Sequence, residues 1–209
     1  MSELTLFPPS GSFHKLENDA LLIDRCLNGE ESAIVTVYNQ YAGSIYRLCY
    51  GILQQREDSE EVLQDTFEYA FRRLENYDDS KASFKTWLYQ IAISRCRNKR
   101  RRKLLKTISI SQILGEQIAD TGLLTPAEEI ELSERQEAIW QALGCLSPKL
   151  RETAILRYYE GFSYREIGLI LSIPQKTAES RMRLAHVALR KMLQTEETMN
   201  RDYKDRAIG

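Results

Sequence analysis

Residues 147–193 read SPKLRETAILRYYEGFSYREIGLILSIPQKTAESRMRLAHVALRKML, and this stretch decides the fold. The pair Ser147-Pro148 predicts the start of a helix, because serine caps free backbone N–H groups and proline is favoured at the first helical position. Gly161 is suited to stop that helix near Tyr159, since glycine adopts the left-handed conformation without strain. The stretch therefore opens with one packed helix.

Two further helices follow. Ser163 and Glu166 form a capping-box pattern, which predicts the start of a short second helix. The sequence Ser172-Ile173-Pro174 breaks it, and a longer third helix begins near Gln175. A short helix, a three-residue turn and a longer helix with basic and hydroxyl residues near its start are typical of a helix-turn-helix that enters the major groove of DNA.

The third helix has an apolar face and a polar one. Apolar side chains at steps of three and four predict a buried stripe: Ala178, Met182, Ala185, Leu189 and Met192. Basic and polar side chains outside this stripe are the candidates for contact with DNA: Gln175, Lys176, Thr177, Ser180, Arg181 and Arg183. The alternative is a helical hairpin whose lysines and arginines only solvate its surface.

Charge is unevenly distributed along the 209 residues, although the formal net charge is only −1. Residues 57–68 hold six acids and no base, residues 95–106 hold eight bases and no acid, and residues 107–134 hold six acids and no base. Such blocks predict separate surfaces that face separate partners.

The acidic block at residues 57–68 has two interpretations. Asp58 is predicted to be the N-cap of a helix that runs to about Leu74, and the helix macrodipole accounts for acids in the first turn. Asp65 and Glu68 lie one or two turns further in, where the macrodipole explains them less well. The second interpretation is a docking surface for a basic protein partner.

The basic block ends a helix that begins near Phe84. Eight bases in twelve residues exceed what the macrodipole favours at a helix C-terminus, so we expect contact with phosphates. A polar stripe flanks the apolar face of this helix: Gln90, Ser94, Arg97 and Arg101. Aromatic residues are interleaved here, some as core and one or two as candidates for stacking on bases of an opened strand: Tyr77, Phe84, Trp87 and Tyr89.

The remaining composition excludes several classes of protein. Cys26, Cys49, Cys96 and Cys145 lie far apart without metal-ligand spacing, so we expect them to be small buried apolar side chains. No secretion signal and no apolar run long enough to cross a bilayer occurs, which indicates a cytoplasmic protein. No metal and no cofactor are expected.

Strand signals are almost absent, so the predicted fold is all-α, with two small helical domains joined by a flexible acidic linker, the C-terminal one a helix-turn-helix. A helix of the second domain is expected to begin at Pro126. In chain order the predicted parts are a flexible leader, 1–15; a first domain, 16–106, which opens with an antiparallel helix pair; the linker, 107–126; the second domain, 127–193; and a frayed tail, 194–209.

Several segments carry a resemblance to a known family. They read DSEEVLQDTF at residues 58–67, FKTWLYQIA at 84–92, LSP at 146–148, GFSYREI at 161–167, and Ile173-Pro174 followed by Thr177, Ser180 and Arg181. Together and in this order they resemble the bacterial RNA polymerase sigma factors of the extracytoplasmic-function type. The resemblance covers about residues 19–193 and leaves out only the two tails.

The resemblance implies an initiation factor, not an enzyme, that binds core RNA polymerase, directs it to specific promoters and helps to melt the −10 region. Residues 16–106 would be sigma region 2, and residues 127–193 would be sigma region 4. Region 4 would read the −35 element with the six polar residues of the third helix while resting on the flap of the second-largest polymerase subunit. Members of this family are commonly held by an anti-sigma factor.

The resemblance also implies two sets of contact residues in the first domain. The contacts with the clamp helices of the largest polymerase subunit would be Asp58, Glu60, Glu61, Gln64, Asp65, Phe67 and Glu68. The contacts with the −10 promoter element would be Asp79, Ser80, Lys81, Ser83, Ser94, Arg97, Asn98, Arg101 and Arg102.

The chain departs from the family pattern at four positions. Relatives often carry Asn and Asp where this chain has Ser94 and Asn98, and many place bases where it has Glu179 and Leu184. The resemblance therefore leaves both the −10 and the −35 sequence preferences open.

Two rival functions remain. A helix-turn-helix regulator that does not bind core polymerase would explain the C-terminal third, but not the acidic helix followed by the basic one. A carboxylate-bridged metal site would use Glu60, Glu61, Asp65 and Glu68. Such sites need Glu-x-x-His pairs, and the two histidines, His14 and His186, are not placed for them.

Overall fold

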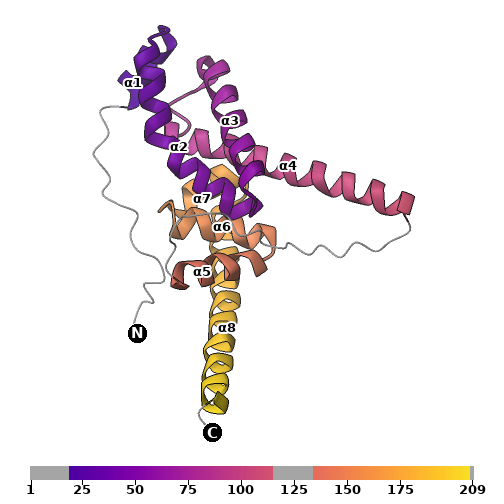
Figure 1. Ribbon diagram of the computed structural model, residues 1–209. Coiled ribbons are helices and arrows are strands. Elements are labelled where there is room, and N and C mark those ends of the chain that lie inside the picture. The colour runs from indigo at the N-terminus through magenta and orange to yellow at the C-terminus, as the bar shows by residue number, and fades with distance from the viewer. Residues whose placement is uncertain (1–18, 115–133, 208–209) are drawn as a thin grey trace. The chain divides into compact units, whose positions relative to one another are not determined.

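The structure, a computed structural model, describes the backbone of residues 19–114 and 134–207 and the side chains of residues 19–105 and 140–192 (Figure 1). Within these ranges the chain forms eight α-helices and one short 3-10 helix, and no strand. The helices fall into two compact units, one N-terminal and one C-terminal. The predicted all-α fold with two helical units is confirmed.

The N-terminal unit is organised around its second helix. Its elements are α1 (Asp19–Leu27), α2 (Glu31–Leu53), α3 (Arg56–Arg72), the 3-10 helix η1 (Leu74–Asn76) and α4 (Phe84–Leu114). α2 packs against α1, α3 and α4, and α3 packs against α4. The largest fully buried side chains of this unit are Ile45, Leu48, Ile52, Phe84, Leu88, Tyr89 and Ile93. Each such burial contributes roughly 1.5–3 kcal/mol, so this core fixes which faces α2 and α4 expose.

The C-terminal unit consists of α5 (Glu134–Cys145), α6 (Pro148–Tyr158), α7 (Tyr164–Leu171) and α8 (Gln175–Ala207). α8 packs against α5 and α6. Four residues of the predicted stripe on α8 are buried, and Met192 is half-buried. The buried four are Ala178, Met182, Ala185 and Leu189. The period of the apolar residues therefore gives the orientation of α8 correctly.

Two helices run further than the sequence pattern predicts. α4 continues to Leu114, so residues 107–114 of the predicted linker are helical. α8 continues to Ala207 through most of the tail that was predicted to be frayed. Neither extension contains glycine or proline, so nothing in the local sequence breaks the helix. The rest of the predicted linker, including the helix expected from Pro126, lies outside the described residues up to residue 133.

Two local predictions are wrong. α3 begins at Arg56, with Gln55 preceding it, so Asp58 lies inside the first turn and is not the N-cap. Cys145 is exposed at the last position of α5, whereas the other three cysteines are buried as predicted. Asp58 pairs instead with Lys99 and Lys103 of α4, and Cys145 lies at the end of its helix.

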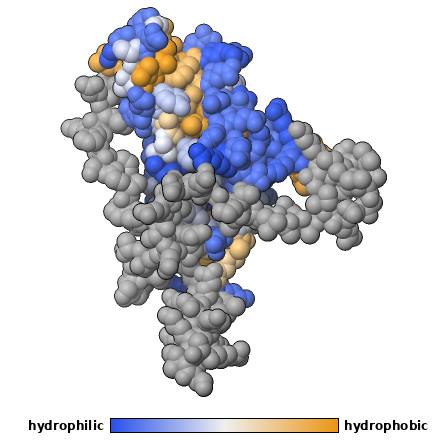
Figure 2. Space-filling view, viewed as in Figure 1, coloured by the Kyte–Doolittle hydropathy of each residue, from blue (hydrophilic) through white to orange (hydrophobic). Residues whose placement is uncertain are grey.

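The surface of the N-terminal unit is not uniform. Figure 2 shows hydrophilic residues over α3 and the described part of α4, whereas hydrophobic residues gather over α1 and α2. The exposed apolar side chains on α1 and α2 include Leu21, Leu27 and Val35. The helices that carry the predicted contacts therefore present polar faces.

Candidate nucleic-acid interfaces

The start of α7 is fixed by the predicted capping box. The backbone N–H of Ser163 donates to Glu166 Oε2 at 2.8 Å, and the backbone N–H of Glu166 lies 3.3 Å from Ser163 Oγ. Gly161, which precedes the box, has φ +72°, as expected for a glycine that ends a helix. These local interactions set the direction in which the chain enters α7.

The turn between α7 and α8 depends on Gly168. The backbone N–H of Ile173 donates to the Gly168 carbonyl oxygen at 2.9 Å, and Ser172 adopts a left-handed φ of +57°. A Cβ atom at position 168 would lie 2.8 Å from the Ile173 carbonyl oxygen, so only glycine fits without a backbone shift. Gly168 is not among the residues predicted from the sequence; its signal is a glycine inside an otherwise apolar helical segment.

The first turns of α8 carry the predicted −35 contacts on an accessible surface. Gln175, Lys176, Ser180 and Arg183 are exposed, and Thr177 and Arg181 are half-buried. Their positions surround the buried stripe, so packing of the stripe leaves these side chains outside the core.

Glu179 lies within this surface. It is exposed, and its Oε1 accepts a hydrogen bond from Gln175 Nε2 at 2.9 Å, one helical turn earlier. It is the single acid between Gln175 and Arg190, a segment that contains four bases. The carboxylate is thus held in place among cations and hydroxyl groups.

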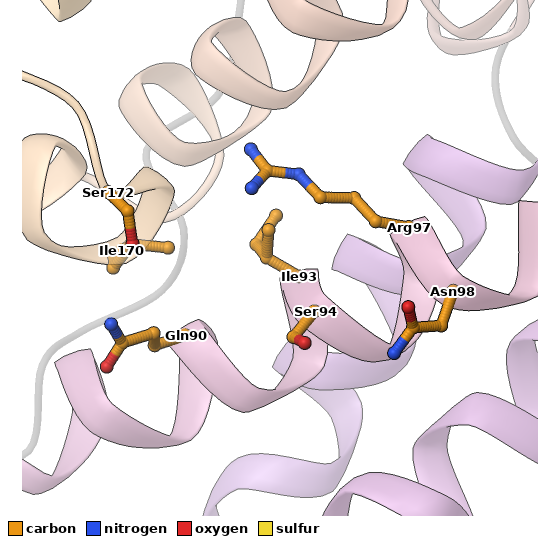
Figure 3. A pocket seen from close by; sticks show the side chains of 7 residues that line it. All are labelled: Gln90, Ile93, Ser94, Arg97, Asn98, Ile170 and Ser172. Atoms are coloured by element: carbon orange, nitrogen blue, oxygen red, sulfur yellow. The ribbon is translucent and has the colours of Figure 1, made fainter. Parts of the chain in front are cut away.

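α4 carries the predicted −10 stripe over several turns. Ser94, Arg101 and Arg102 are exposed, whereas Arg97 and Asn98 are half-buried. Figure 3 shows Gln90, Ser94, Arg97 and Asn98 along this helix. Arg101 Nη2 donates to Asn98 Oδ1 at 3.4 Å, so the two polar side chains lie against each other.

The loop that precedes α4 is organised by Asp78, a residue absent from the predicted contacts. Its Oδ1 accepts from the Ser80 backbone N–H at 3.1 Å and from Ser80 Oγ at 2.6 Å, and its Oδ2 lies 2.7 Å from Lys81 Nζ. The hydrogen bonds from Lys81 and Ser80 lower the pKa of Asp78 to about 2. An aspartate two residues before a serine is the sequence signal for such a turn.

The predicted loop contacts are exposed: Asp79, Ser80, Lys81 and Ser83. Ser83 also stabilises the start of α4, because its Oγ accepts from the Thr86 backbone N–H at 3.2 Å. These side chains therefore share a short, ordered segment that leads directly into α4.

Three aromatic rings meet where this loop joins α4. The ring centroids of Tyr77 and Trp87 lie 5.5 Å apart, and each lies within 5.8 Å of the Phe84 ring. Phe84 is buried, whereas Tyr77 and Trp87 are half-buried. Of the four aromatic candidates, these two keep accessible surface, while Tyr89 is in the core.

The face of α3 differs from the predicted polymerase-contact set at Phe67. This side chain is only 4% exposed, and its ring packs against Tyr38 and Phe71 at centroid distances of 4.8 and 5.9 Å. The other predicted contacts reach the surface: Glu60, Glu61, Gln64 and Glu68 are exposed, and Asp58 and Asp65 are half-buried. Phe67 therefore anchors α3 to α2.

Acids of α3 and bases of α4 pair with each other. Lys99 Nζ lies 3.2 Å from Asp58 Oδ1 and forms a hydrogen bond with Glu61, and Lys103 Nζ lies 3.6 Å from Asp58 Oδ2. The hydrogen bonds from Lys99 to Glu61 and Asp58 raise the pKa of Lys99. The prediction that the acidic and basic blocks form wholly separate surfaces is therefore wrong at these residues.

Two other features are absent from the described residues, a metal site and a membrane-spanning helix. Among them, no group of three or more His, Cys, Asp and Glu side chains is placed to hold a metal ion. No helix among the residues that the structure describes is both long and apolar enough to cross a membrane.

Two family models match the chain, one in each helical unit. The model described as Sigma-70 region 2 matches residues 37–104, and the model described as Sigma-70, region 4 matches residues 136–189. Together they cover more than half of the chain. The fold and these matches define a DNA-binding transcription protein with two helical parts.

Curated relatives extend this similarity along most of the chain. The ECF RNA polymerase sigma factor SigW of Bacillus subtilis is 30% identical over 178 residues, which are 82% of this chain and 94% of the relative. The RNA polymerase sigma-H factor of Pseudomonas aeruginosa is 28% identical over 184 residues, 85% of this chain and 95% of the relative. The chain belongs to the sigma-70 family, in its extracytoplasmic-function branch, and is an alternative transcription initiation factor.

Solved structures share the fold. CnrH in complex with the cytosolic domain of CnrY has a TM-score of 0.64 at 20% identity, with 86% of this chain and 99% of that chain covered. The sigma factor RpoE of Bartonella quintana, in complex with the anti-sigma factor NepR, has a TM-score of 0.60 at 22% identity, with 76% and 95% covered.

Proposed function

We propose that this sigma factor binds core RNA polymerase through the exposed acidic face of α3 and holds promoter DNA at two separate elements. The loop at residues 78–83 and α4 would contact the −10 element, and the first turns of α8 would contact the −35 element. The observation that carries the proposal is that one chain combines exposed basic and polar side chains on both α4 and α8. Sigma regions 2 and 4 match these same segments.

The proposed polymerase contacts are three exposed polar residues of α3: Glu60, Gln64 and Glu68. Glu60 and Glu68 form helical ion pairs with Arg56 and Arg72, which hold their carboxylates along α3. Exposed pairs of this kind are weak, about 0.3–0.5 kcal/mol each, so a basic partner can exchange them at little cost. The clamp helices of the largest polymerase subunit are the proposed partner.

Asp58 and Glu61 have a different role in this proposal. Lys99 engages both carboxylates, and Lys103 also reaches Asp58, so these acids join α3 to α4. Phe67 supports the same helix from the core side. These three residues would therefore orient the polymerase-binding face.

The proposed −10 contacts combine base stacking with phosphate binding. Tyr77 and Trp87 keep accessible ring surface beside the ordered loop, and stacking of an opened base on an aromatic ring contributes about 1–3 kcal/mol. Removing a base from the duplex costs a few kcal/mol, which stacking together with pocket contacts offsets. Strand opening on this basis requires binding energy and no catalytic residue, metal or cofactor.

At the −35 element, Arg181 and Arg183 are the proposed readers of guanine, and Lys176 is a proposed phosphate contact. An arginine that donates both hydrogen bonds to guanine O6 and N7 contributes roughly 1–3 kcal/mol of discrimination. The C-terminal unit would meanwhile rest on the flap of the second-largest polymerase subunit.

We also propose that the chain acts in the cytoplasm and is regulated by an anti-sigma factor. Support comes from solved proteins of the same fold, because RpoE of Bartonella quintana was crystallised with the anti-sigma factor NepR, and CnrH is in complex with the cytosolic domain of CnrY. Exposed apolar residues on α1 and α2, such as Leu21 and Val35, provide further surface for a partner.

The experiment that tests this function is in vitro transcription with purified bacterial core polymerase, followed by start-site sequencing. We expect initiation at a defined set of promoters that share two upstream elements. The alternative, a helix-turn-helix regulator, would bind DNA but would not support initiation by the core enzyme. A chain that binds DNA without co-purifying with core polymerase would therefore contradict the proposal.

A further inference from the structure

The feature that has no place in the proposed contacts is Glu179. It lies on the exposed surface of α8 between Lys176 and Arg183, one position before Ser180. A surface that only attracted phosphate would gain nothing from an acid here, because a carboxylate repels the DNA backbone. A role in discriminating bases is the alternative.

The carboxylate of Glu179 is oriented. Gln175 Nε2 donates to its Oε1 at 2.9 Å, and both side chains are exposed on successive turns of α8. An ionised carboxylate offers about four acceptor sites, so this hydrogen bond leaves most of its accepting capacity available. The carboxylate therefore presents an acceptor, with Gln175 beside it, at the surface that would face the major groove.

The chemistry of base edges selects one partner for such an acceptor. In the major groove cytosine presents the N4 amino donor, whereas guanine presents the acceptors N7 and O6, which would repel a carboxylate. Thymine presents the O4 acceptor and a methyl group, and adenine presents a donor beside the N7 acceptor. Cytosine is therefore the base that a carboxylate accommodates best.

We infer that Glu179, held by Gln175, reads a cytosine in the −35 element and makes this sigma factor selective for that base. The inference rests on the proposed function of α8. It adds a specificity-determining residue that favours cytosine over the other three bases. Arg181 and Arg183 nearby would read guanine, and Lys176 would contribute affinity through a phosphate.

The test is selection of DNA by the full chain bound to core polymerase. The probe is a duplex library that keeps a −10 element found by start-site sequencing and randomises about ten upstream base pairs, one turn of duplex. The wild-type holoenzyme should enrich a cytosine at one position, and replacing that cytosine should weaken binding about tenfold. Glu179→Gln should lose the preference for cytosine and gain adenine at that position, because an amide pairs with adenine N6 and N7.

Two variants separate base reading from general charge. Gln175→Ala keeps the charge of Glu179 and removes its hydrogen bond, so it should reduce the cytosine preference partly. Glu31→Gln removes one negative charge from exposed surface on α2, and it should leave the selected sequence unchanged.

The inference is overturned if Glu179→Gln retains the cytosine, or if it tightens binding to all sequences equally, as loss of a phosphate-repelling charge would. A wild-type holoenzyme that enriches a motif without cytosine overturns it as well, and leaves the proposed function intact. If the wild-type chain initiates at no promoter and enriches no motif, the proposed function fails together with this inference.

Discussion

The basic faces of α4 and α8 differ in what surrounds their cations. On α4 the bases are consecutive, and Lys99 and Lys103 pair with acids of α3. On α8 the polar residues are spaced around a buried stripe, and Lys176 and Arg183 are exposed. The number of bases in a dense run therefore overestimates how many are available to DNA, because some of them form ion pairs within the protein. The following variants test this difference, from the largest expected effect to the smallest.

The double variant Arg101→Ala with Arg102→Ala should have the largest effect. Both side chains are exposed at the part of α4 that we assign to phosphate binding. The salt slope is the slope of the logarithm of the binding constant against the logarithm of the salt concentration. Each lost phosphate contact should reduce its magnitude by about 0.9, so the pair should reduce it by about 2, equally on all DNA sequences. The measurement is holoenzyme binding to promoter and non-promoter duplexes over a range of salt. An unchanged slope would place these arginines away from DNA.

Gly168→Ala should destabilise the C-terminal unit by roughly 1–3 kcal/mol, because the new Cβ would press against the Ile173 carbonyl oxygen, 2.8 Å away. The expected result is loss of −35-dependent binding, with binding to an isolated −10 single strand retained. Thermal unfolding and binding to the two DNA probes measure the two effects. Unchanged stability would mean that the turn shifts without cost.

Arg181→Ala should weaken binding to the promoters that carry the preferred −35 base by roughly 1–3 kcal/mol and leave other promoters nearly unaffected. Comparative binding of the variant and wild-type holoenzymes to a promoter panel measures this. An equal loss on random DNA would make Arg181 a phosphate contact, like the arginines of α4.

Lys99→Met should lower the free energy of unfolding by about 1 kcal/mol. The ammonium group is partly buried against Asp58 and Glu61, which would lose their shared partner. Because Lys99 is already engaged within the protein, the salt slope of DNA binding should not change. A reduced salt slope of DNA binding without loss of stability would mean that Lys99 contacts DNA and does not stabilise the fold. Arg102→Ala, at an exposed site, is the contrasting variant: it should reduce the salt slope and leave the free energy of unfolding unchanged.

The smallest effect concerns the loop before α4. The folded pKa of Asp78 is lowered to about 2. The stability that its ionised carboxylate contributes to the loop is therefore present above the ordinary pKa of 3.8 and is lost as the pH falls from 3.8 to about 2. The amide chemical shift of Ser80 should therefore stay constant from pH 8 down to about pH 4. A titration between about pH 5 and pH 4 would contradict the ordered loop, and Asp78→Asn supplies the baseline without a titrating group.

What the sequence predicted depended on how local each feature is. The capping box of Ser163 and Glu166 and the buried stripe of α8 involve residues within a few turns, so their patterns predicted the structure. The pairing of Lys99 with Asp58 and the contact at Gly168 depend on where one element lies against another. Sequence spacing does not encode such contacts. The separate charge blocks predicted separate surfaces, whereas the structure pairs Lys99 with Asp58.

The candidate contacts show the same limit. Their accessibility was predicted well wherever helical period decides it, as for Ser180 and Arg183. Phe67 was the exception, because the resemblance placed it among polymerase contacts although its apolar spacing indicates the core. Asp78 was missed because it acts through Ser80 and Lys81 and is not itself among the implied contacts.

Because α4 is one continuous helix, it fixes the distance and the angle between the side chains at its two ends. Trp87 and Arg101 belong to one uninterrupted helix, in which each residue advances about 1.5 Å, so they are separated by roughly 21 Å along its axis. That length corresponds to about six base steps of duplex at 3.4 Å each. A one-residue insertion between them would lengthen the helix slightly but rotate its two ends by about 100° relative to each other. The direction in which Trp87 and Arg101 point relative to each other is therefore more sensitive to an insertion than the distance between them.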